Sequence, residues 1–224
     1  RLYMAGLITV IVTGRPAGWC DLIARMWPVD GVIGENGAFW FSYDRKNRYM
    51  KREYWGSIED RNASKVKLAE LSKKIINAVP GCMISSDQNY RESDLAIDFC
   101  EDLSGLKMEE IQRIVRIFQA EGANAQISSI HVNGWFGSYN KLSMSKKYLS
   151  DNHSLDINAD YKAIAFVGDS PNDAPMFEYF PCSVGVSNVM KMAGQVKVLP
   201  KYITSKSGGA GFVEFADLVL NTLY

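Results

Sequence analysis

Two acids and an amide follow closely on an apolar run in FVGDSPNDAPMF, which spans residues 166–177. The run ends at Gly168, and Asp169, Asn172 and Asp173 come next. Carboxylates in a tight turn can hold Mg²⁺, which prefers one or two carboxylates with water and substrate oxygens. Helix capping is the simpler explanation for Asn172 and Asp173, but it does not require an acid at Asp169. We therefore expect Asp169 and Asp173 to bind a magnesium ion.

Polar groups also lie at the end of another predicted strand and at the start of another predicted helix. In VTGR, Thr13 and Gly14 close the apolar stretch 7–14 just before a predicted helix. A hydroxyl and backbone N–H groups at such a turn can cradle a phosphate, although TGR is also common in ordinary turns. Lys141, at the start of another predicted helix, can neutralise a phosphate as a point charge. Its spacing alone fits an exposed surface lysine better.

The hydrophobic pattern predicts an α/β fold with a parallel sheet. Continuous apolar, β-branched runs indicate buried strands, and apolar residues at helical spacing indicate helices. The first and last parts of the chain alternate between the two, with strands at 7–14, 31–38, 161–170 and 182–187, and helices at 16–27, 140–152, 172–180, 189–196 and 209–224.

The middle of the chain has a different order of predicted strands and helices. Short strands are predicted at 39–44, 48–55, 82–86, 94–99 and 125–134, and helices at 64–79 and 107–122. This α+β pattern predicts an inserted domain at 39–133, which splits an α/β core made of 1–38 and 134–224. Ligands of such cores collect at the carboxyl ends of the strands, where the polar groups lie.

Composition narrows the class of partner. The 224 residues contain 25 Lys and Arg and 25 Asp and Glu, so nothing points to nucleic acid or an anionic membrane. The four cysteines form no CxxC or zinc spacing, which favours reduced thiols in a cytoplasmic protein. No apolar run approaches a membrane span, and no signal peptide is visible. We expect a small-molecule partner.

In order along the chain, VTGR, NKLS and GDSPND resemble the second, third and fourth motifs of the haloacid dehalogenase (HAD) superfamily. The pattern is most similar to subfamily IIB, the sucrose- and trehalose-phosphatase-like group with a large α/β cap. The resemblance spans essentially the whole chain. It implies a three-layer Rossmann-like core with a parallel sheet and an inserted α+β cap. It also implies a Mg²⁺-dependent phosphatase that hydrolyses a sugar phosphate or similar small phosphomonoester through an aspartyl-phosphate.

The resemblance assigns roles around the phosphoryl group. It implies that Thr13 and Gly14 bind the transferring group, that Lys141 neutralises it and orients the nucleophile, and that Asn172 contacts phosphate. These roles agree with the charge stabilisation that phosphoryl transfer requires.

The resemblance assigns further roles to the metal and the cap. Asp169 would hold Mg²⁺ and Asp173 would support the metal shell. Arg91 and Asp94, in a polar cap loop, are candidate substrate contacts, although each also fits an ordinary solvated loop. His131 fits no metal pattern, and we expect it to pack near a strand end.

The sequence departs from the family at the first motif. That motif, Asp-x-Asp-Gly-Thr, supplies the nucleophile and lies upstream of VTGR, yet the sequence contains no Asp-x-Asp. The chain begins RLYMAG, without Met, and we expect this start to lie inside a helix. We therefore expect an upstream segment that carries the nucleophile, and an inactive product without it. The alternative is a catalytically inactive relative that keeps the fold and binds a ligand.

Overall fold

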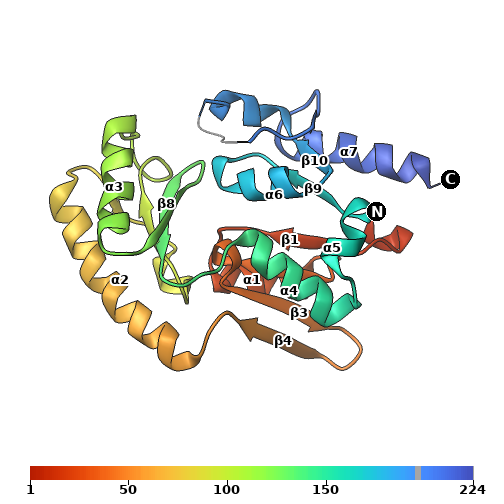
Figure 1. Cartoon of the computed structure of the whole chain (residues 1–224), viewed down its shortest axis with the longest axis horizontal. Coiled ribbons are helices and arrows are strands. Elements are labelled where there is room, and N and C mark those ends of the chain that lie inside the picture. The colour runs from red at the N-terminus through yellow and green to blue at the C-terminus, as the bar shows by residue number, and fades with distance from the viewer. Residues whose placement is uncertain (195–197, 224) are drawn as a thin grey trace.

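The computed structural model describes residues 1–194 and 198–223, and Figure 1 shows its arrangement. The described residues form three sheets, two of which contain parallel strands and one of which is antiparallel. The prediction of an α/β fold with parallel strands is confirmed. None of the described helices is both long enough and apolar enough to cross a membrane. The four cysteines are unpaired.

The first sheet has the order β1-β2-β3-β4. Strand β1 pairs in parallel with β2, while β3 and β4 continue the sheet as an antiparallel hairpin. Helix α1 (Ala17–Met26) packs on this sheet through Ala17, Cys20 and Ala24. The strands are β1 (Val10–Val12), β2 (Gly31–Gly34), β3 (Phe39–Asp44) and β4 (Tyr49–Tyr54).

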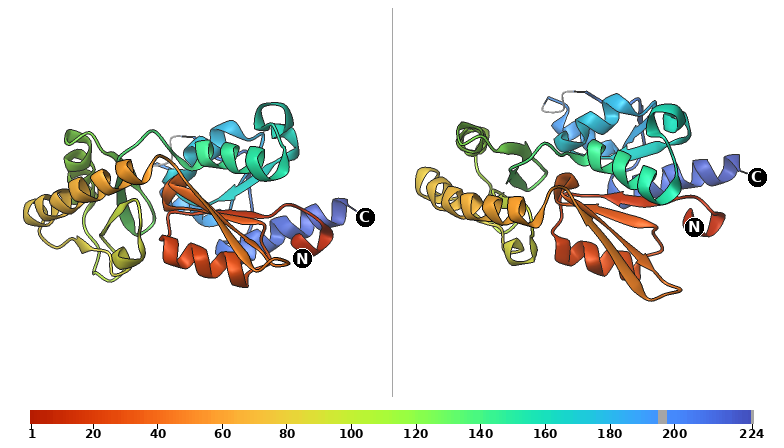
Figure 2. Two further views of the ribbon diagram at one scale, coloured as in Figure 1. Left: turned by 90° about the horizontal axis from the view of Figure 1, so that it is seen from below. Right: turned by 60° about the horizontal axis from the view of Figure 1, so that its bottom comes forward.

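The second sheet has the order β11-β10-β9, and all its pairs are parallel. The strands are β9 (Ala165–Gly168), β10 (Cys182–Gly185) and β11 (Tyr202–Ile203), and the helices of this region are α4 (Lys141–His153), α5 (Ile157–Asp160), α6 (Ala174–Tyr179) and α7 (Gly208–Thr222). Helices α1 and α7 lie on one side of the sheets and α4 lies on the other (Figure 2, left).

Helix α4 joins the first and second sheets through one hydrophobic cluster. Its Met144 and Tyr148 are fully buried, and they share the cluster with Ile33 of β2 and Phe166 of β9. The first residue of α4 is Lys141. The same packing that holds the sheets together therefore fixes the position of this lysine.

The facing edges of β1 and β9 have no strand partner among the described residues. Two apolar cavities of about 410 and 390 Å³ lie between these edges. Val10, Val12 and Phe166 line both, Tyr148 closes the first on the α4 side, and Phe212 closes the second on the α7 side. We call this space the inter-sheet slot.

Residues 58–135 form a separate layer that we call the insert, seen at the left of Figure 1. Its antiparallel sheet has the order β5-β6-β8-β7, and two helices pack on it around their own hydrophobic cluster. Its elements are α2 (Ile58–Ala78), β5 (Met83–Ile84), β6 (Leu95–Asp98), α3 (Met108–Ala120), β7 (Asn124–Ile127) and β8 (His131–Trp135).

The domain boundaries at 39 and 133 remain a prediction. The sequence placed β3 and β4 in the inserted domain, but β3 pairs with β2 of the first sheet and β4 pairs with β3. This pairing favours a first boundary near residue 55, just before α2.

Several element predictions need correction. The single strand predicted at 125–134 is wrong, because the chain turns back at Ser128 and forms β7 and β8. Where a helix was predicted at 189–196, the structure has a 3₁₀ helix at Ser187–Met192, and residues 195 and 196 of the predicted helix lie outside the described residues. Strand β11 and helix α5 were not predicted.

Candidate active site

A cavity of about 220 Å³ opens at the carboxyl ends of β1 and β9, and we call it the strand-end pocket. Its first wall comes from the parallel sheets and α4. Its second wall comes from the insert. The lining residues are 12–15, 141, 166–170, 172 and 173 in the first wall, and 91, 128–131 and 133 in the second.

Thr13 and Gly14 lie where β1 leaves its sheet. The backbone N–H of Thr13 donates to Ile33, and its hydroxyl accepts from the N–H of Arg15 at 3.1 Å. The hydroxyl proton of Thr13 and the N–H of Gly14 take part in no hydrogen bond within the described chain. Both donors lie just before α1, where the helix dipole favours an anion.

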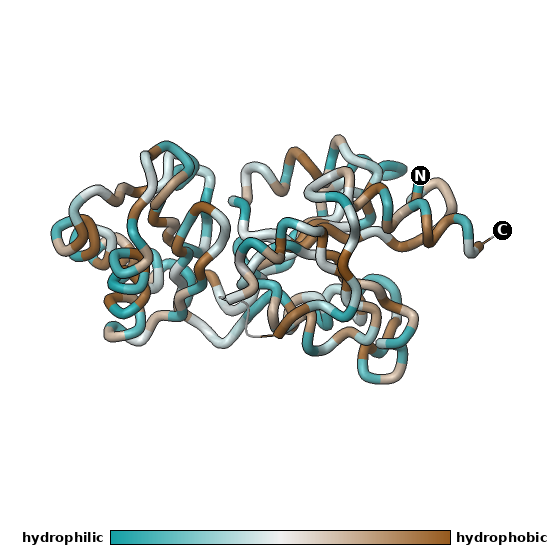
Figure 3. The backbone as a smooth tube through the Cα atoms, turned by 90° about the horizontal axis from the view of Figure 1, so that it is seen from above, coloured by the Kyte–Doolittle hydropathy of each residue, from teal (hydrophilic) through white to brown (hydrophobic). Residues whose placement is uncertain are grey.

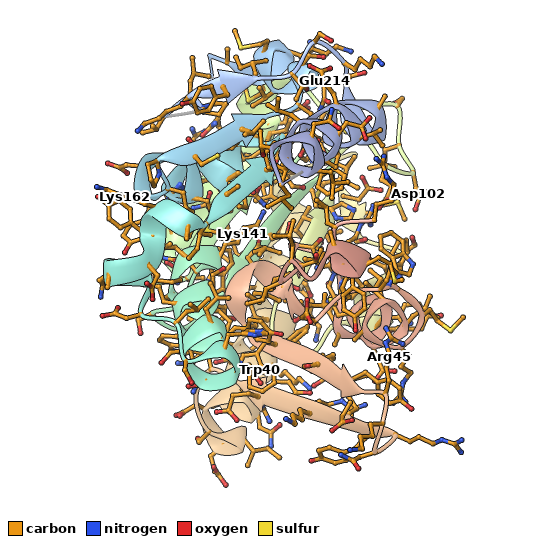
Figure 4. The ribbon with its side chains drawn as sticks, turned by 90° about the vertical axis from the view of Figure 1, so that its right-hand side faces the viewer. Trp40, Arg45, Asp102, Lys141, Lys162 and Glu214 are labelled. Atoms are coloured by element: carbon orange, nitrogen blue, oxygen red, sulfur yellow. The ribbon has the colours of Figure 1, made fainter. Side chains whose placement is uncertain are left out.

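Lys141 is buried at the start of α4, which Asn140 caps by accepting from the N–H of Ser143. Figure 4 labels Lys141 in the middle of the molecule, whereas Lys162 and Arg45 lie at its periphery. The ammonium donates to Asp173 at 2.6 Å and to Asn172 Oδ1 at 3.2 Å. An ammonium has three protons, so one remains for a ligand in the pocket.

Both carboxylate oxygens of Asp173 are engaged inside the loop. Oδ1 accepts from Lys141, and Oδ2 accepts from the N–H groups of Asp169 and Ser170 at 3.0 and 3.2 Å. Asn172 is also engaged, because its Nδ2 donates to Asn36 and its Oδ1 accepts from Lys141. This geometry makes Asp173 and Asn172 positioning groups for Lys141 and for the loop.

Asp169 is the exposed acid of the loop. Its Oδ2 accepts from Asn188 Nδ2 at 3.0 Å, and its Oδ1 accepts from no group of the described chain. Asn188 lies just after β10, and the N–H of Gly208 holds its Oδ1. The sequence analysis did not identify Asn188, although its place after a parallel strand matches the rule that located Asp169.

Arg91 crosses from the insert to the first wall. Its guanidinium is almost fully buried and pairs with Asp87 at 2.9 Å and with Asp94 at 3.0 Å, and it also donates to the carbonyl of Gly14. Arg15, on the opposite side, pairs with Asp87 and with Glu101. We call these five charged residues the Arg91 network.

The predicted substrate contacts Arg91 and Asp94 are therefore paired with each other. Arg91 lines the strand-end pocket, whereas Asp94 does not. The carboxylate of Asp94 is fully buried and also accepts from Asn133 Nδ2. Their substrate role stays a prediction, and the geometry gives both a structural role.

Glu35 ties the first sheet to the insert. Its carboxylate is fully buried and accepts four backbone N–H groups, one from Ala17 and three from residues 92–94. Burial and the nearby Asp94 carboxylate raise the pKa of Glu35 to about 8, while the N–H donors and Arg91 oppose that shift. Sequence reasoning missed Glu35, because its partners lie far away in the chain.

His131 is buried at the start of β8 and faces the pocket. Its Nε2 lies 2.9 Å from Glu101 without the alignment of a hydrogen bond. Burial, assisted by Arg91, lowers the pKa of this imidazole below its usual value. The expectation that it packs near a strand end is confirmed, but its place in the pocket was not foreseen.

The structure brings together most of the residues predicted for the site. Those lining the one pocket are Thr13, Gly14, Arg91, Lys141, Asp169, Asn172 and Asp173. They come from four separate segments of the chain. Their roles in phosphate and metal binding stay predictions.

No protein-family model matches the sequence, and no curated protein matches it. Solved structures do match. The sucrose-phosphatase from Synechocystis sp. PCC6803, solved with sucrose and phosphate, is 14% identical with a TM-score of 0.64, and the match covers 96% of this chain and 85% of that one. A HAD subclass IIB sugar phosphatase is 14% identical with a TM-score of 0.54, covering 90% and 81%.

A third match is a phosphatase of the HAD superfamily from Bacteroides thetaiotaomicron. It is 17% identical with a TM-score of 0.60, and the match covers 96% of this chain and 83% of that one. At such identities the likeness establishes the fold. The expected fold, a Rossmann-like core with an inserted cap, is confirmed.

Proposed function

We propose that this chain, which has the HAD phosphatase fold, is a magnesium-dependent phosphatase of a sugar phosphate or similar small phosphomonoester. One observation carries the proposal: three strand-end or helix-start segments converge on one pocket at the carboxyl ends of parallel strands. They contribute Thr13 and Gly14, Lys141, and Asp169. The four unpaired cysteines support a cytoplasmic location.

In this proposal the phosphate binds between the free donors of the first wall. The N–H of Gly14, the hydroxyl of Thr13 and the third proton of Lys141 surround its oxygens. These groups stabilise the charge that spreads over the equatorial oxygens as the phosphoryl group transfers. Asp173 holds the ammonium of Lys141 in place, because it accepts at 2.6 Å.

The residues of the pocket can supply one carboxylate ligand to a magnesium ion. The described residues contain no cluster of three or more His, Cys, Asp or Glu side chains suited to a metal ion. Asp169 nevertheless presents a free carboxylate oxygen, and magnesium uses one or two carboxylates with phosphate and water oxygens. Asp169 would hold the ion, with Asn188 orienting its carboxylate. The ion would neutralise charge on the phosphate.

The nucleophile requires a further carboxylate. We propose that it lies on a strand that occupies the inter-sheet slot. Val12 and Phe166 line both the slot and the strand-end pocket, so the carboxyl end of such a strand would open into that pocket. A strand there would pair with the free edges of β1 and β9 and bury apolar side chains on both faces.

A non-catalytic binding protein is the second candidate. It is favoured by one observation, since Asp169 and Asp173 are the only carboxylates lining the pocket in the described chain, and Asp173 is fully engaged. Such a protein would bind a phosphorylated ligand through Lys141 and would release no phosphate from it.

Phosphate release tests the proposal. The full gene product is assayed with sugar phosphates and p-nitrophenyl phosphate, in magnesium and in EDTA. Asp169→Asn and Lys141→Ala are expected to reduce turnover at least about a hundredfold, as for other charge-stabilising groups. Lys146→Ala, on the same helix but outside the pocket lining, is the matched control and is expected to retain activity. Turnover that survives EDTA or both site variants would contradict the proposal.

A further inference from the structure

A further cavity lies where the insert joins the rest of the chain, and we call it the linker pocket. Two connections join them, residues 55–57 before α2 and residues 136–140 after β8 (Figure 1). Both connections line the pocket, together with α2 and Ser93. Its volume of about 380 Å³ is within the range of roughly 300–1,000 Å³ that is usual for small-molecule sites. It shares no lining residue with the strand-end pocket.

Three aromatic side chains give the linker pocket an apolar wall. Trp55 comes from the first connection, and Phe136 and Tyr139 come from the second. The rings of Trp55 and Tyr139 lie 6.3 Å apart between centroids and are tilted by 46°. The backbone N–H of Trp55 donates to the carbonyl of Ala38 at 2.8 Å, and Tyr139 is buried. This aromatic wall can pack against the ring of a flat ligand.

Two cations of α2 also line the linker pocket. The guanidinium carbon of Arg61 lies 3.8 Å from the ring centroid of Tyr54, and the ammonium of Lys67 lies 5.3 Å from that of Phe136. Neither cation forms an ion pair or donates a hydrogen bond to an acid within the described chain. Aromatic rings therefore position both cations, while their N–H groups stay available to an anion.

The charge on the lining favours an anion with a single charge. Asp60 is the one acid that lines the pocket in the described part of the chain. Its Oδ2 accepts from the hydroxyl and the N–H of Ser57, which caps α2. Two cations and one acid leave one positive charge in excess, which a carboxylate would neutralise.

Ser93 supplies a buried hydroxyl without a partner. The residue is only 8% exposed, and its Oγ has no hydrogen-bond partner within the described chain. Its backbone N–H donates to Glu35 at 2.6 Å, so the first sheet holds this residue in place. A buried polar group that stays unpaired costs about 1–3 kcal/mol. A ligand oxygen in the linker pocket would supply the missing partner.

We propose that the linker pocket binds a small aromatic carboxylate. The carboxylate accepts from Arg61, from Lys67 and from the hydroxyl of Ser93, and the ring packs against the aromatic wall. The ligand thereby contacts both connections and holds the insert against the first sheet. This site is separate from the proposed phosphatase site and does not depend on its activity.

Isothermal titration calorimetry with the 224-residue chain tests the ligand class. The probes are indole-3-acetate, its uncharged amide indole-3-acetamide, and acetate, which has no ring. Indole-3-acetate is expected to bind at least about tenfold more tightly than the amide, or about 1.4 kcal/mol, and acetate is expected to show no binding. An amide that binds as tightly as the acid, or an acid that does not bind at millimolar concentration, overturns the proposal.

Variants test the contacts of the carboxylate. Arg61→Gln is expected to weaken indole-3-acetate about tenfold, because it removes a charged hydrogen-bond donor. Ser93→Ala is expected to weaken it about threefold or more and to melt no lower than the parent, since the lost hydroxyl had no partner in the chain. Lys73→Gln, exposed on the same helix and outside the pocket, is the control. Equal weakening in Lys73→Gln and Arg61→Gln overturns the proposal.

Hydrogen exchange measured by mass spectrometry locates the probe. Indole-3-acetate is expected to slow exchange in both connections, residues 55–57 and 136–139. Slowing that is confined to segments of the strand-end pocket or the inter-sheet slot overturns the proposal. Lys141→Ala is expected to lose inorganic phosphate and to keep indole-3-acetate. If it loses both, the probe occupies the strand-end pocket, and this inference fails while the proposed function stands.

Discussion

Lys141 and Asp169 of the strand-end pocket are each held by partners from another segment. Lys141 is held by Asp173 and Asn172, and Asp169 by Asn188. Buried polar groups that are fully paired keep one orientation, because breaking any pair leaves a buried charge or donor without a partner. The site is therefore preorganised at the level of single residues.

Burial of His131 predicts a pH dependence of stability. Its pKa is lowered in the folded chain, by burial first and then by Arg91, while Glu101, Asp87 and Asp98 oppose the shift. The folded state thus binds this proton less readily than the unfolded state does. The stability contribution is present above the usual pKa of about 6.5 and is lost as the pH falls below it.

His131→Gln removes this titration. The melting temperature of the parent is expected to drop more than that of His131→Gln between about pH 7.5 and pH 5, measured by circular dichroism. His153→Gln is the control, and it should follow the parent. An identical drop in the parent and in His131→Gln would show that His131 does not titrate in a buried place.

At the scale of elements, one turn determines where α4 begins. Gly37 has φ +107, a left-handed conformation that favours glycine, and a Cβ there would collide with the backbone of Asn140. Asn140 is the N-cap of α4, and Lys141 is its first residue. The turn at residues 35–38 (ENGA), just after β2, therefore sets the position of the pocket lysine although it lies far from it in the sequence.

Gly37→Ala is expected to disturb this contact. Strain at φ and the collision with Asn140 should lower the free energy of unfolding by about 2–4 kcal/mol, measured in urea. Because α4 must shift, phosphate affinity should fall as well. Gly122→Ala is the control, since Gly122 also has positive φ (+76) but meets no atom within 4 Å. If both variants lose phosphate affinity equally, the turn does not position Lys141.

The elements that the sequence predicted well are those whose signal is local. Apolar β-branched runs and Gly turns located β1, β2 and β9, and the strand-end rule then located Asp169 and Thr13. The turn at Ser128 was missed because its signal is a hydroxyl that bonds to the backbone of His131, within a run that otherwise reads as one strand. The pairing of Arg91 with Asp94, and the role of Glu35, depend on contacts between elements that no local pattern encodes.

At the scale of the whole molecule, apolar surface remains open around the inter-sheet slot. The tube of Figure 3 shows hydrophobic stretches along the helix that leads to the C-terminus. On that helix, which is α7, Phe212 and Leu218 are 42% and 65% exposed. On α1, Leu22 and Met26 are 61% and 71% exposed. Helices α1 and α7 lie on the same side of the sheets, so a strand in the slot followed by a helix could cover both surfaces.

The open slot predicts binding of a hydrophobic dye. Anilinonaphthalene sulfonate should fluoresce with the 224-residue chain, and Val10→Lys should reduce that fluorescence because Val10 lines both cavities. Val66→Lys is the control, since Val66 is exposed on α2, far from the slot. A signal that is unchanged in Val10→Lys, or equally reduced in both variants, would place the dye elsewhere.

The inter-sheet slot, with an unpaired strand edge on each side in the described chain, has a consequence for how activity could be regulated. The folded state would bind a strand in the slot and the unfolded state would not, so strand binding and folding would be linked by mass action. If the strand were offered as a separate peptide, the melting temperature would rise with peptide concentration. The catalytic rate would follow the same saturation curve. The concentration of the strand peptide, rather than the concentration of this chain, would then determine the rate of phosphate release.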